Sequence, residues 1–464
     1  MGAKRILVMG NGLSVGPLCS YFEVRGYPLT IAARSLEKTS LLAGGTLKAT
    51  VTPLVLKEGG DNLVALVSEH DLVASFVPGN CQIPVVQACL KARVSLVVSC
   101  HAHYFEAFPG GIEALDQQAQ TQGIAIVSEL GIDCGYLGMM AKAEIDRLHE
   151  SSKTVESLVF HAGVIPGEYI NPFDYAFFWA AKKAALSYVS PKAGKADWIK
   201  EGQRVRVDEN TVYANPTIAE IPGAGDLETH PNLDSGAFQY PSLYEVEGIQ
   251  HFYHGTLRHL GWCNTLRSIV RLGYSDQTPC QHLQGRPFRE VTLALCGSSG
   301  TDAKAAAARH LGRFIYDDDM LRLEWLGLFS NQMALAGING SPADLITELM
   351  LKRLGVFGYD SGVSSRVINA FDIIASGSAG QESVQSVFDV RDAGQGHSVC
   401  TRLISETAAI VGRNLLDGDL KGLVGYHHPY HRVFYLPVLR EQATNGFRNR
   451  VWINGSENSP AWID

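Results

Sequence analysis

Short continuous apolar runs alternate with amphipathic segments over the first 130 residues. The strand-like runs, rich in Val, Ile and Leu, are RILVMG, PLTIAAR, DLVASFVP, VSLVVSC and IAIVSELG. Between them lie VGPLCSYFEVRG, SLEKTSLLAGG, IPVVQACLKAR and GIEALDQQAQTQG, which have helical spacing. Strands that are apolar throughout are typical of a parallel sheet covered by helices on both faces. The pattern therefore predicts a doubly wound α/β domain.

The pattern changes from about residue 154. VESLVFHAGVIP predicts a strand, and NPFDYAFFWAAKKAALSYV predicts a loop that enters a helix. Short strand candidates such as RVRVDENTVYA and SLYEVEG follow, so we expect an inserted α+β domain with antiparallel strands. Residues 255–355 are expected to be mostly helical, starting with GTLRHLGWCNTLRSIVRLG. After further strands, SVCTRLISETAAIVGRNLLDG predicts a long amphipathic helix before a polar tail.

A glycine-rich loop separates the first strand from the first helix. Gly10 is placed to make the turn, and Gly12 would let a pyrophosphate approach the backbone at the helix N-terminus. The third glycine is displaced, because Val15 stands where G-x-G-x-x-G has glycine and Gly16 follows it. The alternative is a purely structural turn. The strand-loop-helix context favours a dinucleotide site.

The end of the second strand indicates which dinucleotide is bound. An NAD site would place Asp or Glu there for the ribose hydroxyls, whereas this chain has Ala33, Arg34 and Ser35, with Lys38 one turn on. A guanidinium can bind a 2′-phosphate with two hydrogen bonds. The sequence therefore predicts NADP(H), although a solvated basic loop is the alternative interpretation.

Composition narrows the class of protein. The chain has 464 residues, is 46% hydrophobic and carries a net charge of −8, which argues against nucleic acid as a partner. Its nine cysteines include no C-x-x-C pair, so we expect no metal site, no disulfide framework and a reducing, cytoplasmic location. MGAKRILVMG predicts a strand instead of a signal peptide, and no apolar run is long enough to span a membrane.

Several motifs together resemble the glutamate-forming saccharopine dehydrogenases. They are GNGLSVGP, IAARSLEK, SELGIDCGYLGMMA, NPFDYAFFW, GTLRHLGW, EWLGLFSN and LLDGDLKG. The resemblance implies a Rossmann-type domain at 1–132, completed by about 392–464. It further implies an α+β catalytic and dimerisation domain at 133–260 and 356–391, a helical subdomain at 261–355, and a homodimer. It also implies small-molecule amine and carbonyl substrates that are joined through an imine reduced by NADPH, or the reverse reaction.

The resemblance also assigns residues. The expected cofactor contacts are Gly10, Asn11, Gly12, Leu13, Ser14, Val15, Arg34, Ser35, Lys38, Val77, Ser99, Cys100 and Leu130. Asp133 matches the acid of the family's G-[IL]-D-P-G segment, in which Cys134 here replaces the proline. Its expected role is catalytic, and a helix N-cap is the alternative. His101 stands where the family often has Tyr and could exchange protons near neutral pH. A histidine that is merely hydrogen-bonded in a turn beside His103 is its alternative.

The substrate positions depart from the family pattern. Trp179 and Arg258 match an aromatic residue and an arginine of the family, with Arg258 expected at a helix start, but a core tryptophan and a structural salt bridge are their alternatives. Leu233 and His254 replace two arginines, and Ala162 replaces a cysteine. Each lost arginine removes a charge-assisted contact to a carboxylate. We therefore expect a substrate with fewer carboxylates, and keep open a polyamine dehydrogenase or synthase of the carboxynorspermidine or homospermidine kind and a non-catalytic NADPH-binding regulator.

Overall fold

The structure, a computed structural model, divides into two compact units. It describes residues 3–35, 37, 49–54, 56, 61–178, 180–190, 196–208, 211–233, 238–312, 316–334, 340–357, 362–394 and 396–463. Unit 1 comprises 1–153, 396–451 and 457–464, and unit 2 comprises 154–395 and 452–456. Residues 133–153 therefore belong to unit 1, where α6 (Tyr136–Glu150) lies, whereas the sequence reading began the second domain at residue 133.

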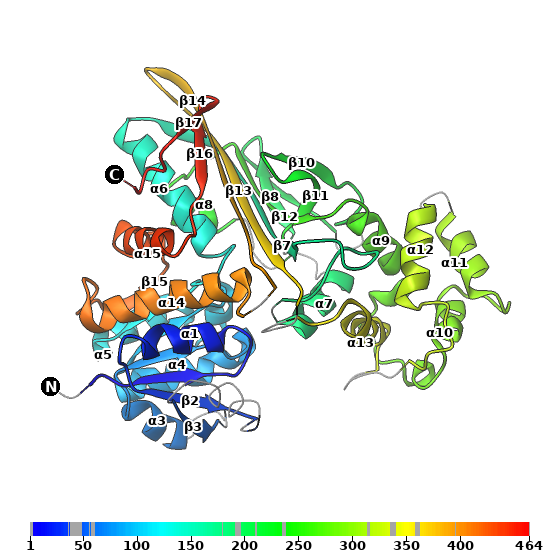
Figure 1. The fold of residues 1–464 in the computed structure, drawn as a ribbon, viewed down its shortest axis with the longest axis horizontal. Coiled ribbons are helices and arrows are strands. Elements are labelled where there is room, and N and C mark those ends of the chain that lie inside the picture. The colour runs from blue at the N-terminus through cyan, green and yellow to red at the C-terminus, as the bar shows by residue number, and fades with distance from the viewer. Residues whose placement is uncertain are drawn as a thin grey trace. The chain divides into compact units, whose positions relative to one another are not determined.

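Unit 1 is built on a parallel sheet, which among the described residues has seven strands in the order β15-β6-β5-β4-β1-β2-β3 (Figure 1). Their bounds are β1 Ile6–Met9, β2 Leu29–Ala33, β3 Ala49–Pro53, β4 Leu72–Ser75, β5 Ser95–Val98, β6 Ala125–Val127 and β15 Gly425–His427. All residues of β1, β2, β4 and β6 are buried, because helices cover the sheet. The predicted Rossmann-type sheet is confirmed.

The helices of unit 1 supply the two covering layers. They are α1 Val15–Glu23, α3 Asp61–Ser68, α4 Gln82–Ala92, α5 Gly111–Gln122, α6, α14 Val399–Asp417 and α15 Arg432–Thr444. The long α14 packs against α1, β4 and β5, so a segment from the far end of the chain closes the N-terminal domain. The predicted polar tail was wrong, because β15 and α15 follow α14 and α15 buries Phe434, Tyr435, Val438 and Leu439.

The second sheet is mixed, has most of its residues in unit 2 and follows the order β10-β11-β12-β7-β13-β14-β16-β17, while β8 pairs with β12 and β9. The strands are β7 Thr154–Pro166, β8 Asp197–Lys200, β9 Gln203–Arg206, β10 Thr217–Ile221, β11 Gly225–Pro231, β12 His251–Arg258, β13 Ser365–Gly377, β14 Gly380–Arg391, β16 Arg450–Ile453 and β17 Ser456–Asn458. β12 runs parallel to β7 and antiparallel to β11, whereas β13 is antiparallel to β7 and β14. Only part of the predicted antiparallel arrangement is therefore right.

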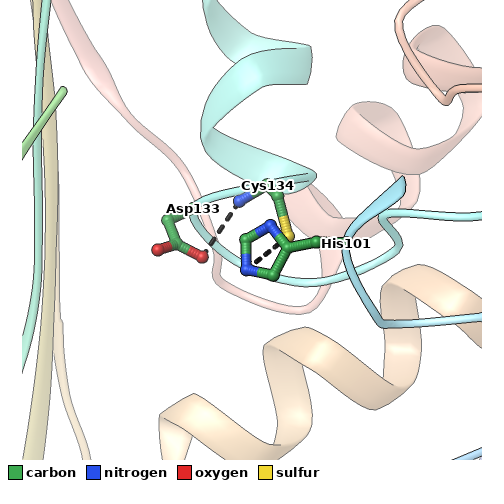
Figure 2. A group of neighbouring side chains, drawn as sticks. All are labelled: His101, Asp133 and Cys134. Atoms are coloured by element: carbon green, nitrogen blue, oxygen red, sulfur yellow. Dashed lines mark hydrogen bonds between the residues drawn. The ribbon is translucent and has the colours of Figure 1, made fainter. Parts of the chain in front are cut away.

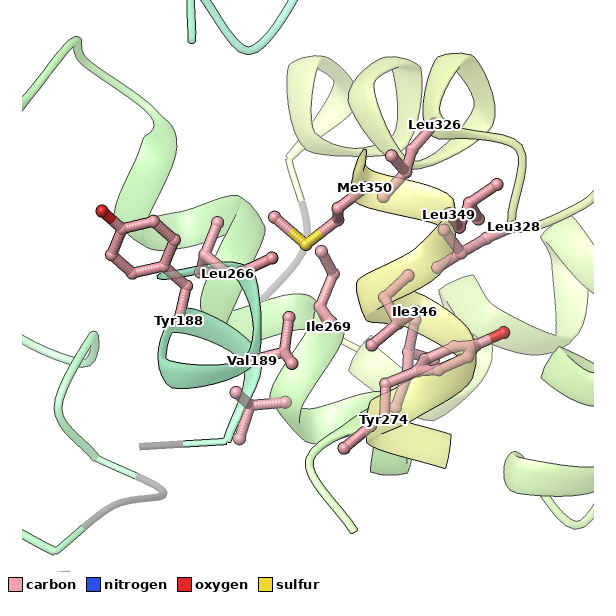
Figure 3. Packing of buried hydrophobic residues seen from close by; sticks show 14 of the residues in the cluster. Tyr188, Val189, Leu266, Ile269, Tyr274, Leu326, Leu328, Ile346, Leu349 and Met350 are labelled. Atoms are coloured by element: carbon pink, nitrogen blue, oxygen red, sulfur yellow. The ribbon is translucent and has the colours of Figure 1, made fainter. Parts of the chain in front are cut away.

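The helices of unit 2 enclose an apolar core of their own. They are α7 Ala181–Val189, α8 Tyr240–Leu243, α9 Trp262–Ile269, α10 Phe288–Leu295, α11 Ala303–Leu311, α12 Asp317–Leu326 and α13 Pro342–Leu354. Figure 3 shows side chains of α7, α9 and α13 meeting in this core, among them Val189, Leu266, Ile346 and Met350. Among the described helices, none combines the length and apolar character that crossing a membrane requires.

Two local predictions in unit 2 were wrong. SLYEVEG is not a strand, because Tyr240 and Tyr244, four residues apart around α8, stack with their ring centroids 5.6 Å apart. GTLR is not the start of a helix but the end of β12. Pairing with β7 and β11 on both sides keeps this segment extended, and α9 begins only after Gly261, whose φ is +90°.

Candidate active site

Most of the predicted cofactor residues lie along one edge of the parallel sheet in unit 1. They follow the carboxyl ends of five strands that are neighbours in the sheet. Gly10, Asn11, Gly12, Leu13, Ser14 and Val15 follow β1, Arg34 and Ser35 follow β2, Val77 follows β4, Ser99 and Cys100 follow β5, and Leu130 follows β6. The strand order changes direction between β1 and β4. Ligands of doubly wound folds bind at this point.

The glycine loop has the shape that a phosphate cradle needs. Gly10 adopts φ +118°, and a Cβ there would meet the Phe76 carbonyl oxygen at 3.0 Å. A Cβ on Gly12 would meet no atom within 4 Å, so its backbone faces open space just before α1. The displaced Gly16 has a different role, since a Cβ there would lie 2.6 Å from Cε1 of His397. The third glycine thus lets the C-terminal segment approach α1.

The two residues directly after β2, Arg34 and Ser35, are a cation and a hydroxyl. Arg34 is exposed, and Asn11 Nδ2 donates a hydrogen bond to the Ser35 carbonyl oxygen at 3.2 Å, which connects this loop with the glycine loop. A mobile guanidinium beside the cradle can reach a phosphate on the ribose. Lys38, predicted to assist, lies outside the described residues.

The structure brings His101, Asp133 and Cys134 together (Figure 2). His101 follows β5, and the other two lie in the loop between β6 and α6. His101 Nε2 is 3.8 Å from Cys134 Sγ, and the Asp133 carboxylate accepts a hydrogen bond from the Cys134 N–H at 3.0 Å. The alternative role of Asp133 as a helix cap is wrong, because Gly135 is the N-cap of α6. His101 also stacks on His103, with ring centroids 5.5 Å apart.

Sequence reasoning missed the buried carboxylate of Glu129, which holds the His101 loop in place. Its Oε1 accepts the Ala102 N–H at 3.2 Å, its own N–H donates to the Cys100 carbonyl, and Oε2 accepts from His428 and Tyr430, each at 3.1 Å. Burial raises the pKa of Glu129, but interactions with His428 and His101 and the hydrogen bond from the Ala102 N–H together outweigh it, so the pKa lies below its usual value. Its φ of +58° is strained for a residue other than glycine. Glu129 thereby clamps both peptide groups of His101.

In unit 2, Arg258 ends β12 inside a cage of aromatic rings. It is 2% exposed, and its guanidinium carbon lies 4.9 Å from the Tyr175 ring centroid, 5.1 Å from that of Tyr188 and 5.6 Å from that of Trp262. Nη1 donates to the Leu257 carbonyl at 2.6 Å, and Nη2 donates to the Tyr188 hydroxyl. Within the described residues Nε has no hydrogen-bond partner, and the groups that interact with the Arg258 guanidinium are neutral tyrosines, with no carboxylate in an ion pair with it. The salt-bridge alternative is therefore wrong in this part of the chain.

The other predicted substrate residues that the structure describes are Leu233 and His254. Leu233 packs in the same apolar cluster as Tyr175, Tyr188, Tyr213 and Trp262. His254 and Arg258 are four residues apart on β12 and so point to one face of the sheet, where the register also places Ala162. The His254 ring lies 5.5 Å from the Phe160 ring. Trp179 lies outside the described residues.

The family of the chain follows from two matches. Residues 6–127 match the saccharopine dehydrogenase NADP binding domain, and residues 131–447 match the saccharopine dehydrogenase C-terminal domain. The chain belongs to the saccharopine dehydrogenase family. The predicted NADP(H) cofactor is confirmed by the first of these matches, and the glycine cradle and exposed Arg34 fit that cofactor.

Individual relatives are distant. The chain is 26% identical to the mitochondrial alpha-aminoadipic semialdehyde synthase of Bos taurus, covering 96% of this chain and 47% of that protein. It is 22% identical to the L-glutamate-forming saccharopine dehydrogenase of Pyricularia oryzae, covering 95% and 97%. The solved saccharopine dehydrogenase (L-Glu forming) of Saccharomyces cerevisiae superposes with a TM-score of 0.83 at 20% identity, over 97% of this chain and all of the other. The chain thus spans about half the length of the first of these relatives.

The saccharopine dehydrogenase family assignment does not explain every group near the predicted site. Sequence reasoning did not find Tyr175, Tyr188 and Tyr213 around Arg258, because aromatic residues in such apolar segments look like ordinary core positions. It also passed over Glu129, which lies in the segment SELG directly after a strand. Two signals could have found them: an acidic residue inside an apolar strand end, and tyrosines where phenylalanine would fill the core.

Proposed function

We propose that this chain is an NADP(H)-dependent oxidoreductase that couples an amine with an aldehyde or oxo acid through an imine, or catalyses the reverse. The observation that carries the proposal is the placing of His101 and Asp133 at the same sheet edge as the glycine cradle and Arg34. Proton-transferring groups beside a dinucleotide site are what imine reduction requires. Several relatives are L-glutamate-forming saccharopine dehydrogenases, and their activity supports the proposal.

The proposed reaction passes through a carbinolamine and an imine. The amine adds to the carbonyl carbon to give a carbinolamine, which takes up a proton on oxygen and loses water to form the imine. NADPH supplies a hydride to the imine carbon, and a proton reaches the nitrogen. His101 Nε2 is proposed to exchange protons with the carbinolamine oxygen and the nitrogen, because an imidazole does so near neutral pH. Asp133 is proposed to orient the cationic nitrogen through its negatively charged carboxylate.

Recognition of the substrate is assigned to unit 2. Arg258 is proposed to pair with one carboxylate, since a buried guanidinium without a carboxylate partner gains most from an incoming anion. Leu233 and His254 supply an apolar side chain and an imidazole instead of two more permanent cations. A second substrate carboxylate would then lose its water without gaining a charge partner. The proposed substrates therefore carry fewer carboxylates than saccharopine, and polyamines are included among the amines.

The test is a screen for NADPH oxidation that crosses amino acids and polyamines with 2-oxo acids and aldehydes, using purified full-length protein. We expect turnover with at least one pair, and we expect Asp133→Asn and His101→Phe each to lower kcat while NADPH binding stays within about twofold. Tight NADPH binding with no turnover for any pair of substrates would contradict the proposed enzymatic activity and favour a non-catalytic NADPH-binding regulator. The cytoplasmic location and the homodimer stay predictions.

A further inference from the structure

The side chains of His101, Asp133 and Cys134 form a cluster with the composition of a metal site. Each offers one ligand atom, and these atoms all lie within 4.8 Å of one another. A search for C-x-x-C spacing could not find this cluster, because its imidazole comes from the end of β5 and its thiol and carboxylate from the loop before α6. The cluster combines a thiol, an imidazole and a carboxylate, which are the three side-chain ligands of zinc.

The distances suit a tetrahedral ion. With zinc bonds of about 2.3 Å to sulfur and 2.0–2.1 Å to nitrogen, a tetrahedral angle separates the two ligand atoms by roughly 3.6 Å. His101 Nε2 and Cys134 Sγ are 3.8 Å apart, so a shift of a few tenths of an ångström would bring this pair to tetrahedral spacing. The Asp133 carboxylate lies within 4.8 Å of both atoms and has to move closer to join them. His101 and Asp133 are half-buried, and Cys134 is buried. Figure 2 shows the three side chains close together. Three protein ligands leave a fourth position for water.

The loop that carries two of the ligands is built to hold its shape. Gly131 N–H donates to the Cys134 carbonyl at 3.3 Å, and Tyr136 N–H donates to the Gly131 carbonyl at 3.1 Å. Gly135 adopts φ +156°, and a Cβ there would lie 2.5 Å from the Gly131 oxygen, so only glycine fits. Because the turn is this tight, Asp133 and Cys134 stay beside His101 without a ligand. A preformed site loses less entropy when the ion binds.

The position of His101 suits this role. Nδ1 of His101 is buried and has no hydrogen-bond partner among the described residues, whereas Nε2 lies 3.8 Å from Cys134 Sγ. The buried Glu129 carboxylate and N–H hold the peptide groups on both sides of His101, which fixes the backbone that carries the imidazole. Groups that hold a ligand residue in place commonly strengthen metal sites.

We propose that Cys134 Sγ, His101 Nε2 and the Asp133 carboxylate bind a thiophilic divalent cation, with Zn²⁺ as the reference ion. Binding displaces the thiol proton to solvent and leaves a thiolate on the metal. The regulatory consequence rests on the proposed function: an ion held by His101 and Asp133 occupies the groups assigned to proton transfer, so occupancy inhibits the enzyme reversibly.

The test titrates Co²⁺ into the purified full-length chain under reducing conditions and follows the thiolate-to-cobalt charge-transfer band in the near ultraviolet. Zn²⁺ affinity is then measured by competition with a chromophoric chelator. The matched control is Cys280→Ser, because Cys280 Sγ also lies 3.5 Å from an imidazole nitrogen, that of His282, but no third ligand joins that pair among the described residues. We expect the band in the wild type and in Cys280→Ser, and its loss in Cys134→Ser with affinity for Zn²⁺ at least roughly tenfold weaker.

Circular dichroism verifies that each variant is folded. His101→Ala removes a second ligand and keeps the thiol, and it should weaken Zn²⁺ binding about as much as Cys134→Ser does. No band in the wild type, or a band that survives in Cys134→Ser, would overturn the site. Inhibition by Zn²⁺, measured relative to each protein's own activity, should be relieved by chelator and reduced in Cys134→Ser. Because the band needs no substrate, an inactive protein that still shows it would contradict the proposed function and leave the metal site standing.

Discussion

Replacing Arg258 by methionine should weaken recognition of the substrate and leave the stability of the fold nearly unchanged. The guanidinium is buried in a ring of Tyr175, Tyr188 and Trp262 and has no carboxylate partner among the described residues. Methionine has a similar length, is apolar and fills irregular space, so it can occupy the cage. We expect Arg258→Met to fold normally and to lose most of its activity toward carboxylate substrates.

The magnitudes follow from the contacts. Two hydrogen bonds from the cation, to the Leu257 carbonyl and the Tyr188 hydroxyl, contribute about 3–6 kcal/mol at typical values, and the cation–π contacts add more. Removing the ion from water costs several kcal/mol, which methionine does not incur. The net change in unfolding free energy should therefore stay within about 2 kcal/mol. A substrate carboxylate held by two charge-assisted bonds would lose about 3–6 kcal/mol, or roughly 10²- to 10⁴-fold in kcat/KM.

The assay compares Arg258→Met with Arg366→Met. Arg366 is the matched control because it makes a two-point ion pair with Asp389, at 2.7 and 2.6 Å, whose removal leaves a carboxylate unpaired. Chemical denaturation gives the stabilities, and kcat/KM is measured for the best substrate from the screen and for its carboxamide. We expect Arg366→Met to lose stability and keep kcat/KM, and Arg258→Met to do the reverse. Loss of stability with unchanged kcat/KM in Arg258→Met would refute a recognition role.

Three further predictions concern the cofactor and the buried ionisable groups. Arg34→Ala should weaken NADPH binding by about 1.5–3 kcal/mol for each lost charge-assisted bond and leave NADH binding nearly unchanged in fluorescence titrations. Equal losses of affinity for both cofactors would contradict the assignment of Arg34 to the 2′-phosphate. Glu129→Gln should lower the unfolding free energy by about 3 kcal/mol and also reduce kcat, because the His101 loop loses its anchor. Burial, together with the nearby His254, lowers the pKa of His161 from 6.5 to about 4. The unfolded chain therefore takes up a proton at higher pH than the folded protein, and the free energy of unfolding should fall by about 3 kcal/mol as the pH drops from 6.5 to 4. His161→Gln should lose less stability over that range, and the same pH dependence in this variant as in the wild type would contradict the shift.

Local sequence patterns were sufficient to predict the parallel sheet. Five of its seven described strands were predicted because they are short, mostly apolar and followed by a loop or helix signal. β3 and β15 were not predicted, because ATVTP is half polar and GYH is a three-residue strand from the far end of the chain. The cradle was also predictable, since Gly10 and Gly12 are in one turn. The displaced Gly16 was not, because its partner His397 comes from the other end of the chain.

Features set by distant contacts could not be predicted. Arg258 lies in a strand because β7 and β11 pair with its segment, whereas the sequence around it has helical spacing. The anchoring of His101 by Glu129, His428 and Tyr430 joins residues about 300 positions apart. Side chains that meet only after folding leave no periodic signal, which is also why Cys134 was identified only as a replaced proline.

The central claim is that the chain transfers a hydride from NADPH to the carbon of an imine. The most direct measurement uses NADPH deuterated at the transferable C4 position with the amine and carbonyl pair that gives turnover, followed by mass spectrometry of the product. The account predicts a secondary amine that carries one deuterium on the former carbonyl carbon, with one NADPH oxidised per product. A product without deuterium at that carbon, or a deuterated alcohol with the amine unchanged, would contradict it.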